Sequence, residues 1–141
     1  GGIVNPGYWG VPVWPNTTYR ASIYLRAKGA RSPGPVTMTI VNSASGKVLA
    51  RAVFPAAGPK WRRYTATMRT GEVATSSDNF VRLTVSRPGS VLMNVVSLFP
   101  PTYDNQPNGF RIDLMDKLAA MHPKFLRFPG GNFLEGKTPA D

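Results

Sequence analysis

YRASIYLR, residues 19–26, places an apolar or aromatic side chain at every second position. A period of two is the spacing of a β-strand that buries one face and exposes the other. The stretch therefore predicts a strand with one face in a core. The predicted inward set is Tyr19, Ala21, Ile23 and Leu25, and the predicted outward set is Arg20, Ser22, Tyr24 and Arg26.

Five further segments have the apolar alternation or the β-rich composition of strands. Residues 42–46 form the turn of a predicted hairpin, and Arg87-Pro88-Gly89-Ser90 is a strong turn signal between the last two segments. With no helical pattern between them, residues 1–100 are predicted to form an antiparallel β-sandwich. The five segments are residues 36–41, 47–54, 61–69, 80–87 and 91–99.

The composition fits a folded protein of one domain, or of one domain and a piece of another. Of the 141 residues 42% are hydrophobic, and Gly and Pro, at 14 each, favour a turn-rich β architecture. The absence of Cys excludes a disulfide framework and a thiolate metal site. No metal or other cofactor is predicted.

No apolar run reaches the roughly 18–20 residues of a membrane helix, so no membrane partner is predicted. The first residues, GGIVN, lack the basic and apolar regions of a signal peptide. We interpret the chain as an internal piece of a larger protein. The compartment stays open, with an extracellular or periplasmic location favoured, because a β-sandwich can be secreted without disulfides.

The excess of positive over negative charge is confined to the predicted sandwich. Residues 1–100 hold 12 Lys and Arg against Glu72 and Asp78, whereas residues 101–141 hold five charges of each sign. Such an excess is typical of a protein that binds a polyanion, either nucleic acid or an acidic polysaccharide. The basic residues stand at strand spacing and not in a run, which favours a solvated sheet face over a nucleic-acid partner.

The pattern changes after Pro100-Pro101. An apolar stripe predicts a helix over residues 109–122 that Asn108 caps and Pro123 ends. A strand is predicted over residues 124–128, so residues 101–141 have the helix and strand of an α/β fold. The stripe consists of Phe110, Leu114, Leu118 and Met121.

The segment after the predicted strand reads Pro129-Gly130-Gly131-Asn132. Two glycines let the backbone turn tightly and approach a ligand closely. An amide side chain both donates and accepts hydrogen bonds, which suits contact with a polar ligand. Asn132 is therefore a candidate for ligand contact, and a cap of its own turn is the alternative.

Residues 108–115, NGFRIDLM, and 123–136, PKFLRFPGGNFLEG, resemble the start of the catalytic (β/α)8 barrel of family 51 α-L-arabinofuranosidases. These are retaining glycosidases that remove terminal arabinofuranose from arabinoxylan, arabinan and related polymers. Residues 5–10, NPGYWG, and 19–27 are similar to the carbohydrate-binding-module-like jelly roll of one branch of the family. The resemblance implies that the sandwich at residues 1–100 is a jelly roll of the galactose-binding-like type, and that residues 101–141 are an incomplete barrel.

The resemblance also implies roles for single residues. Asn132 matches an Asn that hydrogen-bonds arabinose beside the scissile bond, and Gly130 and Gly131 shape its loop. Retaining hydrolysis needs two carboxyl groups about 5–5.5 Å apart. The chain contains only Glu72 and Glu135, and the family's catalytic pair lies on later barrel strands, so no catalytic residue is assigned and the fragment is expected to be inactive.

Four aromatic residues are candidates for stacking on sugar rings. Tyr8, Trp9 and Trp14 lie in the irregular, Pro-rich start of the chain, where loops carry function, and Trp61 opens a predicted strand. The alternative is that these rings belong to the core. Trp61 and Tyr64 are three apart, so we expect them to point to opposite faces.

These observations lead to one reading and two alternatives. The chain is part of a retaining α-L-arabinofuranosidase, and its sandwich supports the barrel and binds plant polysaccharide. The alternatives are a basic β-module for nucleic acid or another polyanion, and a purely structural interaction domain. Self-association through residues 108–136, or disorder of this segment, is expected, because the helix stripe and the following strand would leave an apolar patch.

Overall fold

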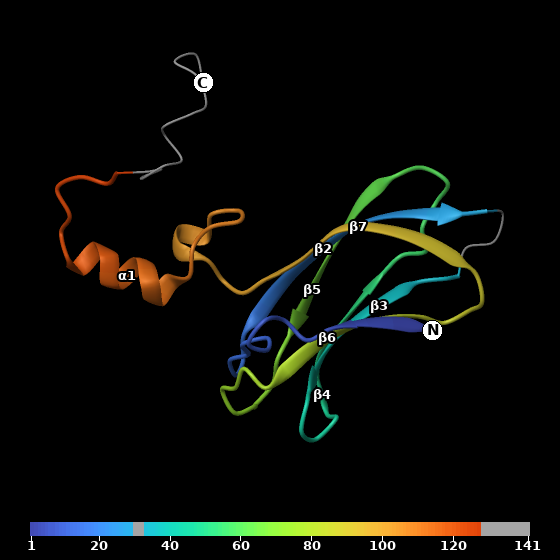
Figure 1. The fold of residues 1–141 in the computed structure, drawn as a ribbon, viewed down its shortest axis with the longest axis horizontal. Coiled ribbons are helices and arrows are strands. Elements are labelled where there is room, and N and C mark those ends of the chain that lie inside the picture. Colours follow the sequence, from blue (N-terminus) through green and yellow to red (C-terminus); the bar gives the residue numbers. More distant parts are fainter. Residues whose placement is uncertain (30–32, 128–141) are drawn as a thin grey trace, which may run out of the picture.

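The computed structural model describes residues 1–29 and 33–127. These residues form two antiparallel sheets that face one another, as Figure 1 shows, and the predicted β-sandwich is confirmed. The four-stranded sheet has the order β1 (Gly2–Asn5), β6 (Asn79–Val85), β3 (Val36–Asn42), β4 (Val48–Phe54). The three-stranded sheet has the order β5 (Arg62–Arg69), β2 (Thr18–Lys28), β7 (Ser90–Phe99).

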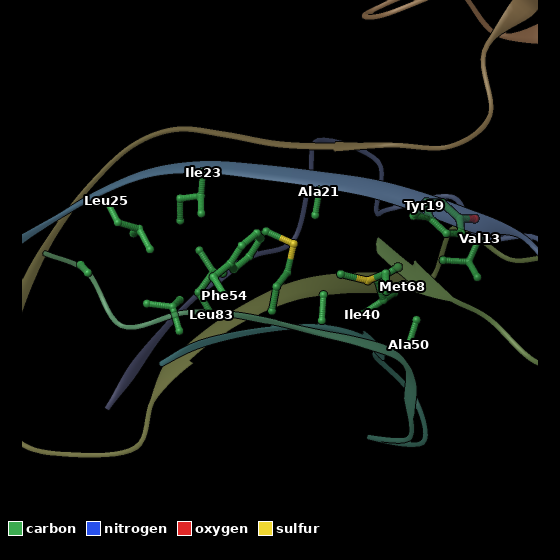
Figure 2. Packing of buried hydrophobic residues seen from close by; sticks show 14 residues of the cluster. Val13, Tyr19, Ala21, Ile23, Leu25, Ile40, Ala50, Phe54, Met68 and Leu83 are labelled. Atoms are coloured by element: carbon green, nitrogen blue, oxygen red, sulfur yellow. The ribbon is translucent and has the colours of Figure 1, made fainter. Parts of the chain in front are cut away.

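The core lies between the two sheets. The predicted inward set of β2 is buried, and Figure 2 shows Ile23 and Leu25 pointing toward Phe54 and Leu83 of the opposite sheet. Fully burying one such side chain contributes about 1.5–3 kcal/mol. The alternation of residues 19–26 therefore stabilises β2 as the central strand of its sheet.

One strand, β1, has no counterpart in the sequence prediction. It pairs with β6 at the edge of the four-stranded sheet, with Ile3 opposite Leu83. All of its residues are exposed. Two apolar residues beside glycines give too short a pattern for periodicity to detect, and pairing with β6 makes this segment a strand.

A β-bulge interrupts β7 where it pairs with β2. Ser22 lies opposite Ser97 and Tyr24 opposite Asn94, so β7 has one more residue than β2 between these two pairs. Within the bulge, Val95 has a φ of 45°. This left-handed conformation is strained for a β-branched residue, and such bulges redirect the side chains that follow them.

The predicted helix is present but shorter. Helix α1 covers Ile112–Ala120, and Asn108 does not cap it, because Arg111 is the residue at its N-terminus. Thr102 forms an isolated β-bridge with Arg111, and the Tyr103 N–H donates to the Phe110 carbonyl at 3.0 Å. These bonds close a loop over residues 102–111, which contains the short 3-10 helix η1 (Tyr103–Asn105) and keeps Phe110 out of α1.

The N-terminus of α1 has no side-chain cap, and a salt bridge joins Arg111 and Asp113 there. The Arg111 Nε donates to Asp113 Oδ1 at 3.0 Å. The Arg111 hydrogen bond lowers the pKa of the Asp113 carboxyl below its usual value. A carboxylate in the first turn of a helix also interacts favourably with the helix dipole.

The strand expected at residues 124–128 is not formed over its described part. Residues 124–127 have no strand structure, and Phe128 lies outside the described residues. A strand needs a neighbour for its backbone hydrogen bonds, and no described strand pairs with this segment. Its composition alone was therefore not sufficient to predict its conformation.

The apolar stripe of the helix is exposed, as expected for a face without a covering layer. Figure 1 shows α1 beyond the end of β7 and apart from both sheets. In the described part of the chain, no helix is long and apolar enough to cross a membrane. The exposed apolar residues of this region are Phe110, Ile112, Leu114, Leu118, Met121, Phe125 and Leu126.

Candidate functional site

The residues predicted to contact arabinose lie outside the described residues. Gly130, Gly131 and Asn132 belong to the segment 128–141, and so does Glu135. Their assignment stays a prediction that rests on the resemblance. The aromatic candidates, by contrast, all lie in the described part of the chain.

Tyr8 and Trp9 form an exposed aromatic pair on the loop between β1 and β2. Their exposed fractions are 89% and 83%, among the highest of the large hydrophobic side chains. The ring centroids are 5.0 Å apart with an interplanar angle of 87°, an edge-to-face contact. Both rings therefore present apolar surface to solvent at one end of the sandwich.

Hydrogen bonds from the buried Asn79 hold the base of this loop. The side-chain amide of Asn79, itself buried, donates to the Val11 carbonyl at 3.0 Å and to the Ser76 carbonyl at 2.8 Å. The Val11 N–H in turn donates to the Asn79 carbonyl at 2.9 Å. Asn79, the first residue of β6, thus connects the aromatic loop to this strand.

Close backbone packing also restricts the loop. Gly10 has a φ of 82°, and a Cβ there would lie 1.8 Å from the Ser77 carbonyl oxygen. Only glycine fits this position. The Gly7 N–H donates to Asn5 Oδ1 at 2.8 Å, which orders the turn before Tyr8.

The aromatic pair adjoins a shallow hollow with polar walls. Ser43, Ser77 and Asp78 line it together with Tyr8 and Trp9. An aromatic ring packs on the C–H face of a sugar, while hydroxyl and carboxylate oxygens accept hydrogen bonds from sugar hydroxyls. The arrangement combines the two elements of a saccharide site.

Trp14 has a different environment from the exposed pair. It is half-buried against the core, and its backbone N–H donates to the Tyr19 hydroxyl at 3.0 Å. Its carbonyl accepts from Thr70 Oγ1 at 2.6 Å. Trp14 also lines a hollow together with Pro101 and Ile112, between the sandwich and the start of α1.

Trp61 lies just before β5 and is 44% exposed. The Arg26 guanidinium lies 5.4 Å from the centroid of its ring, a cation–π contact. Tyr64, three residues later, packs against the core, and its hydroxyl accepts from the Gly58 N–H at 3.4 Å. Trp61 and Tyr64 therefore face different sides, as their spacing predicts.

The structure brings only two of the four aromatic candidates together. Tyr8 and Trp9 adjoin Asn79, at the end of the sandwich where β6 begins. Trp61 is next to Arg62, which pairs with Leu25 near the other end of β2. A single sugar platform of all four rings is not formed.

Sequence reasoning did not identify a second, polar groove on the outer face of the three-stranded sheet. Its lining includes Arg20, Ser22, Arg63, Thr65 and Ser97. These residues come from three strands that are far apart in the sequence, so no local motif joins them. The alternation of residues 19–26, which predicts that Arg20 and Ser22 face outward, was the one sequence signal for this groove.

Comparisons with known proteins relate the whole chain to one group of enzymes. No protein-family model matches the sequence. A probable α-L-arabinofuranosidase A of Emericella nidulans is 34% identical over 145 residues, covering 99% of this chain and 25% of that protein. An extracellular exo-α-L-arabinofuranosidase of Streptomyces chartreusis is 39% identical, covering 92% of this chain and 15% of that protein.

A plant relative and a solved structure agree with these matches. The α-L-arabinofuranosidase 1 of Arabidopsis thaliana is 33% identical over 96% of this chain and 20% of its own length. An arabinose-bound GH51 α-L-arabinofuranosidase has a TM-score of 0.84 and 36% identity, covering 99% of this chain and 23% of that one. The chain thus spans about a quarter of these relatives or less. Over nearly its whole length it is homologous to one segment of the family 51 α-L-arabinofuranosidases.

Proposed function

We propose that the chain is part of a retaining α-L-arabinofuranosidase that acts on arabinose-substituted plant polysaccharides. The supporting observation is 36% identity over 99% of the chain to an arabinose-bound enzyme of this family. Retention requires a nucleophile and an acid/base carboxyl group about 5–5.5 Å apart. We expect both carboxyl groups to lie in the part of the enzyme that corresponds to the three quarters of its relatives that this chain does not cover.

Within that enzyme, the proposed role of Asn132 is to hydrogen-bond the arabinose beside the scissile bond. Gly130 and Gly131 would allow the backbone to turn close to the sugar. An Asn at the C-terminal end of a barrel strand is well placed for such a contact. In the full-length enzyme, Asn132→Ala should lower kcat/KM for an aryl arabinofuranoside without changing the melting temperature.

The proposed division into domains follows the same logic. Residues 1–100 form the sandwich module, whose last strand, β7, ends at Phe99. Residues 101–141 begin the barrel, which would cover the apolar face of α1. The exposed stripe from Phe110 to Met121 supports this division, because apolar side chains that face water do not stabilise an isolated α1.

The sandwich itself is proposed to bind polysaccharide through Tyr8 and Trp9. The observation that carries this is an exposed aromatic pair on a loop held by the buried Asn79. A preorganised loop loses little entropy on binding, so its rings can stack on sugar at low cost.

Affinity electrophoresis on gels containing arabinoxylan, arabinan or xylan tests this role. The chain should be retarded by at least one polymer, and Trp9→Ala should reduce the retardation severalfold. Phe110→Ala is the matched control, since it removes another largely exposed aromatic ring from a different region. A chain that migrates freely through all three gels would remove the binding half of the proposal.

A further inference from the structure

The groove on the outer face of the β5–β2–β7 sheet is built around a row of three hydroxyl groups. Ser22 of β2 lies opposite Thr65 of β5 on one side and Ser97 of β7 on the other. Residues directly opposite in antiparallel strands project from the same face. The Oγ atoms of Ser22 and Ser97 are 2.7 Å apart, so two hydroxyls of the row already form a hydrogen bond.

Two arginines lie on either side of this row. Arg63 lies opposite Tyr24, and its Nη2 donates to Ser22 Oγ at 3.4 Å, which orients the guanidinium toward the hydroxyl row. Arg20 is on the other side, opposite Thr67 and Phe99. Both arginines line the groove.

A closed loop forms the wall at the Arg20 end. Thr102, Pro107 and Asn108 line the groove from the 102–111 loop. Thr102 is 3% exposed, and its Oγ1 donates to the Gln106 carbonyl at 2.7 Å. The cavity volume is about 560 Å³, within the usual range of small-ligand sites.

The electrostatics of the groove are one-sided. Among the described residues no carboxylate lines it, and residues 1–100 hold only Glu72 and Asp78 against their 12 basic residues. A guanidinium group beside hydroxyls is suited to a ligand with a carboxylate and several hydroxyl groups. A nucleic acid would instead need a line of cations and exposed rings along its backbone.

From this juxtaposition we propose that the groove binds a uronic-acid residue of an acidic polysaccharide, with Arg63 on the carboxylate and the Ser22–Ser97–Thr65 row on the sugar hydroxyls. Arg20 extends the positive field toward the neighbouring sugar. The proposal rests on the polysaccharide-binding role given above. It adds the class of sugar and a site separate from the Tyr8–Trp9 loop.

Isothermal titration of the full 141-residue chain with tri-galacturonate tests the proposal. Binding is expected, and Arg63→Gln should weaken it about tenfold, which is the loss of one charge-assisted hydrogen bond. Arg51→Gln is the matched control, because it makes the same charge change on an exposed position of β4, in the other sheet. Methyl-esterified tri-galacturonate, which has no free carboxylate, should bind about as weakly as the acid binds to the Arg63 variant.

Thr65→Val provides a second test that preserves side-chain shape. It removes one hydroxyl of the row from an exposed strand position, so folding is retained, and binding should fall severalfold. Equal weakening by Arg63→Gln and Arg51→Gln would overturn the proposal in favour of diffuse charge attraction. Equal binding of the ester and the acid would also overturn it, as would tighter, Arg63-dependent binding of oligo(dT).

The outcome is separable from that of the general polysaccharide role. If arabinan or arabinoxylan still retards the chain through Trp9 while tri-galacturonate does not bind, only the uronate site is wrong. If tri-galacturonate binds in an Arg63-dependent way and the neutral polymers do not retard the chain, the uronate site holds and the Tyr8–Trp9 platform is wrong.

Discussion

Ser22 and Ser97 share a hydrogen bond of 2.7 Å because the bulge at Val95 shifts β7 by one residue against β2. If the pairing of Tyr24 with Asn94 continued in register, without the bulge, the apolar Val96 would lie opposite Ser22. The bulge therefore places a hydroxyl in the groove at the cost of a valine in the left-handed region.

Substitution of Val95 by glycine should stabilise the chain. Glycine adopts a φ of 45° without steric strain, and the Val95 side chain is 63% exposed, so little burial is lost. We expect the free energy of unfolding in urea to rise by up to about 1 kcal/mol. Val53→Gly, at an exposed extended position of β4, should instead lower it by about 0.5–1 kcal/mol. The same sign for both variants would show that Val95 is not strained.

Removal of the Asn79 amide should loosen the aromatic loop. Asn79→Ala removes the side-chain donor of the part-buried Val11 and Ser76 carbonyls, at a cost of about 1–3 kcal/mol in unfolding free energy. Retardation by polysaccharide should fall together with stability. Asn5→Ala, which removes a hydrogen bond at an exposed position of the same loop, should cost less than about 1 kcal/mol. Equal losses for the two variants would argue against Asn79 as the anchor.

Stability should decrease in alkaline solution through Tyr19. Burial raises the pKa of its phenol above the ordinary value of 10.0, so the folded state favours the protonated form. The stabilisation is complete below about pH 10 and is lost as pH rises from there through the folded pKa. Urea unfolding from pH 8 to 11 measures this loss, and in Tyr19→Phe the Tyr19 part of the slope should disappear. If the slope of unfolding free energy against pH were unchanged in Tyr19→Phe, the alkaline loss of stability would come from other groups.

Tyr19→Phe should also be less stable at neutral pH. The backbone N–H of Trp14 donates to the Tyr19 hydroxyl and would lose this partner, at a cost of about 1–3 kcal/mol. The pH-dependent and pH-independent effects can thus be read from one series of unfolding curves.

The exposed face of α1 should cause self-association. Leu114 and Leu118 are half exposed on one helical face, and burying them between two chains removes apolar surface from water. Light scattering should give a mass above 15.3 kDa that returns to the monomer value in Leu118→Lys. Lys117→Ala, at the neighbouring helix position, should leave the mass unchanged. A monomeric wild-type chain at high concentration would contradict this.

Much of the sandwich could be predicted from local patterns. The alternation from Tyr19 to Leu25 depends only on which side chains are apolar, so it located β2 and the face of β2 that is buried in the core. The same reasoning located the other long strands within a few residues. It did not detect β1, which has no apolar period of its own and becomes a strand only by pairing with β6.

The start of α1 was predicted incorrectly because a tertiary contact outweighed a local preference. Asn108 is a good cap in isolation, yet it adopts a φ of 55° in the loop that the Thr102–Arg111 bridge closes. The exposure of Tyr8 and Trp9 likewise followed from tertiary structure. Their sequence marked them as candidates, whereas the Asn79 hydrogen bonds decided that the loop presents both rings to solvent.

The sequence by itself determined the β-sandwich class, the stripe of the helix and the family to which this segment is homologous, because periodicity, turn residues and motifs are local properties of the chain. Only the tertiary structure decided the register of β7 against β2, and with it the groove that joins Arg63, Ser22 and Ser97. Register depends on backbone hydrogen bonds between residues about 75 positions apart and on the bulge at Val95 that shifts them. No local pattern contains that information.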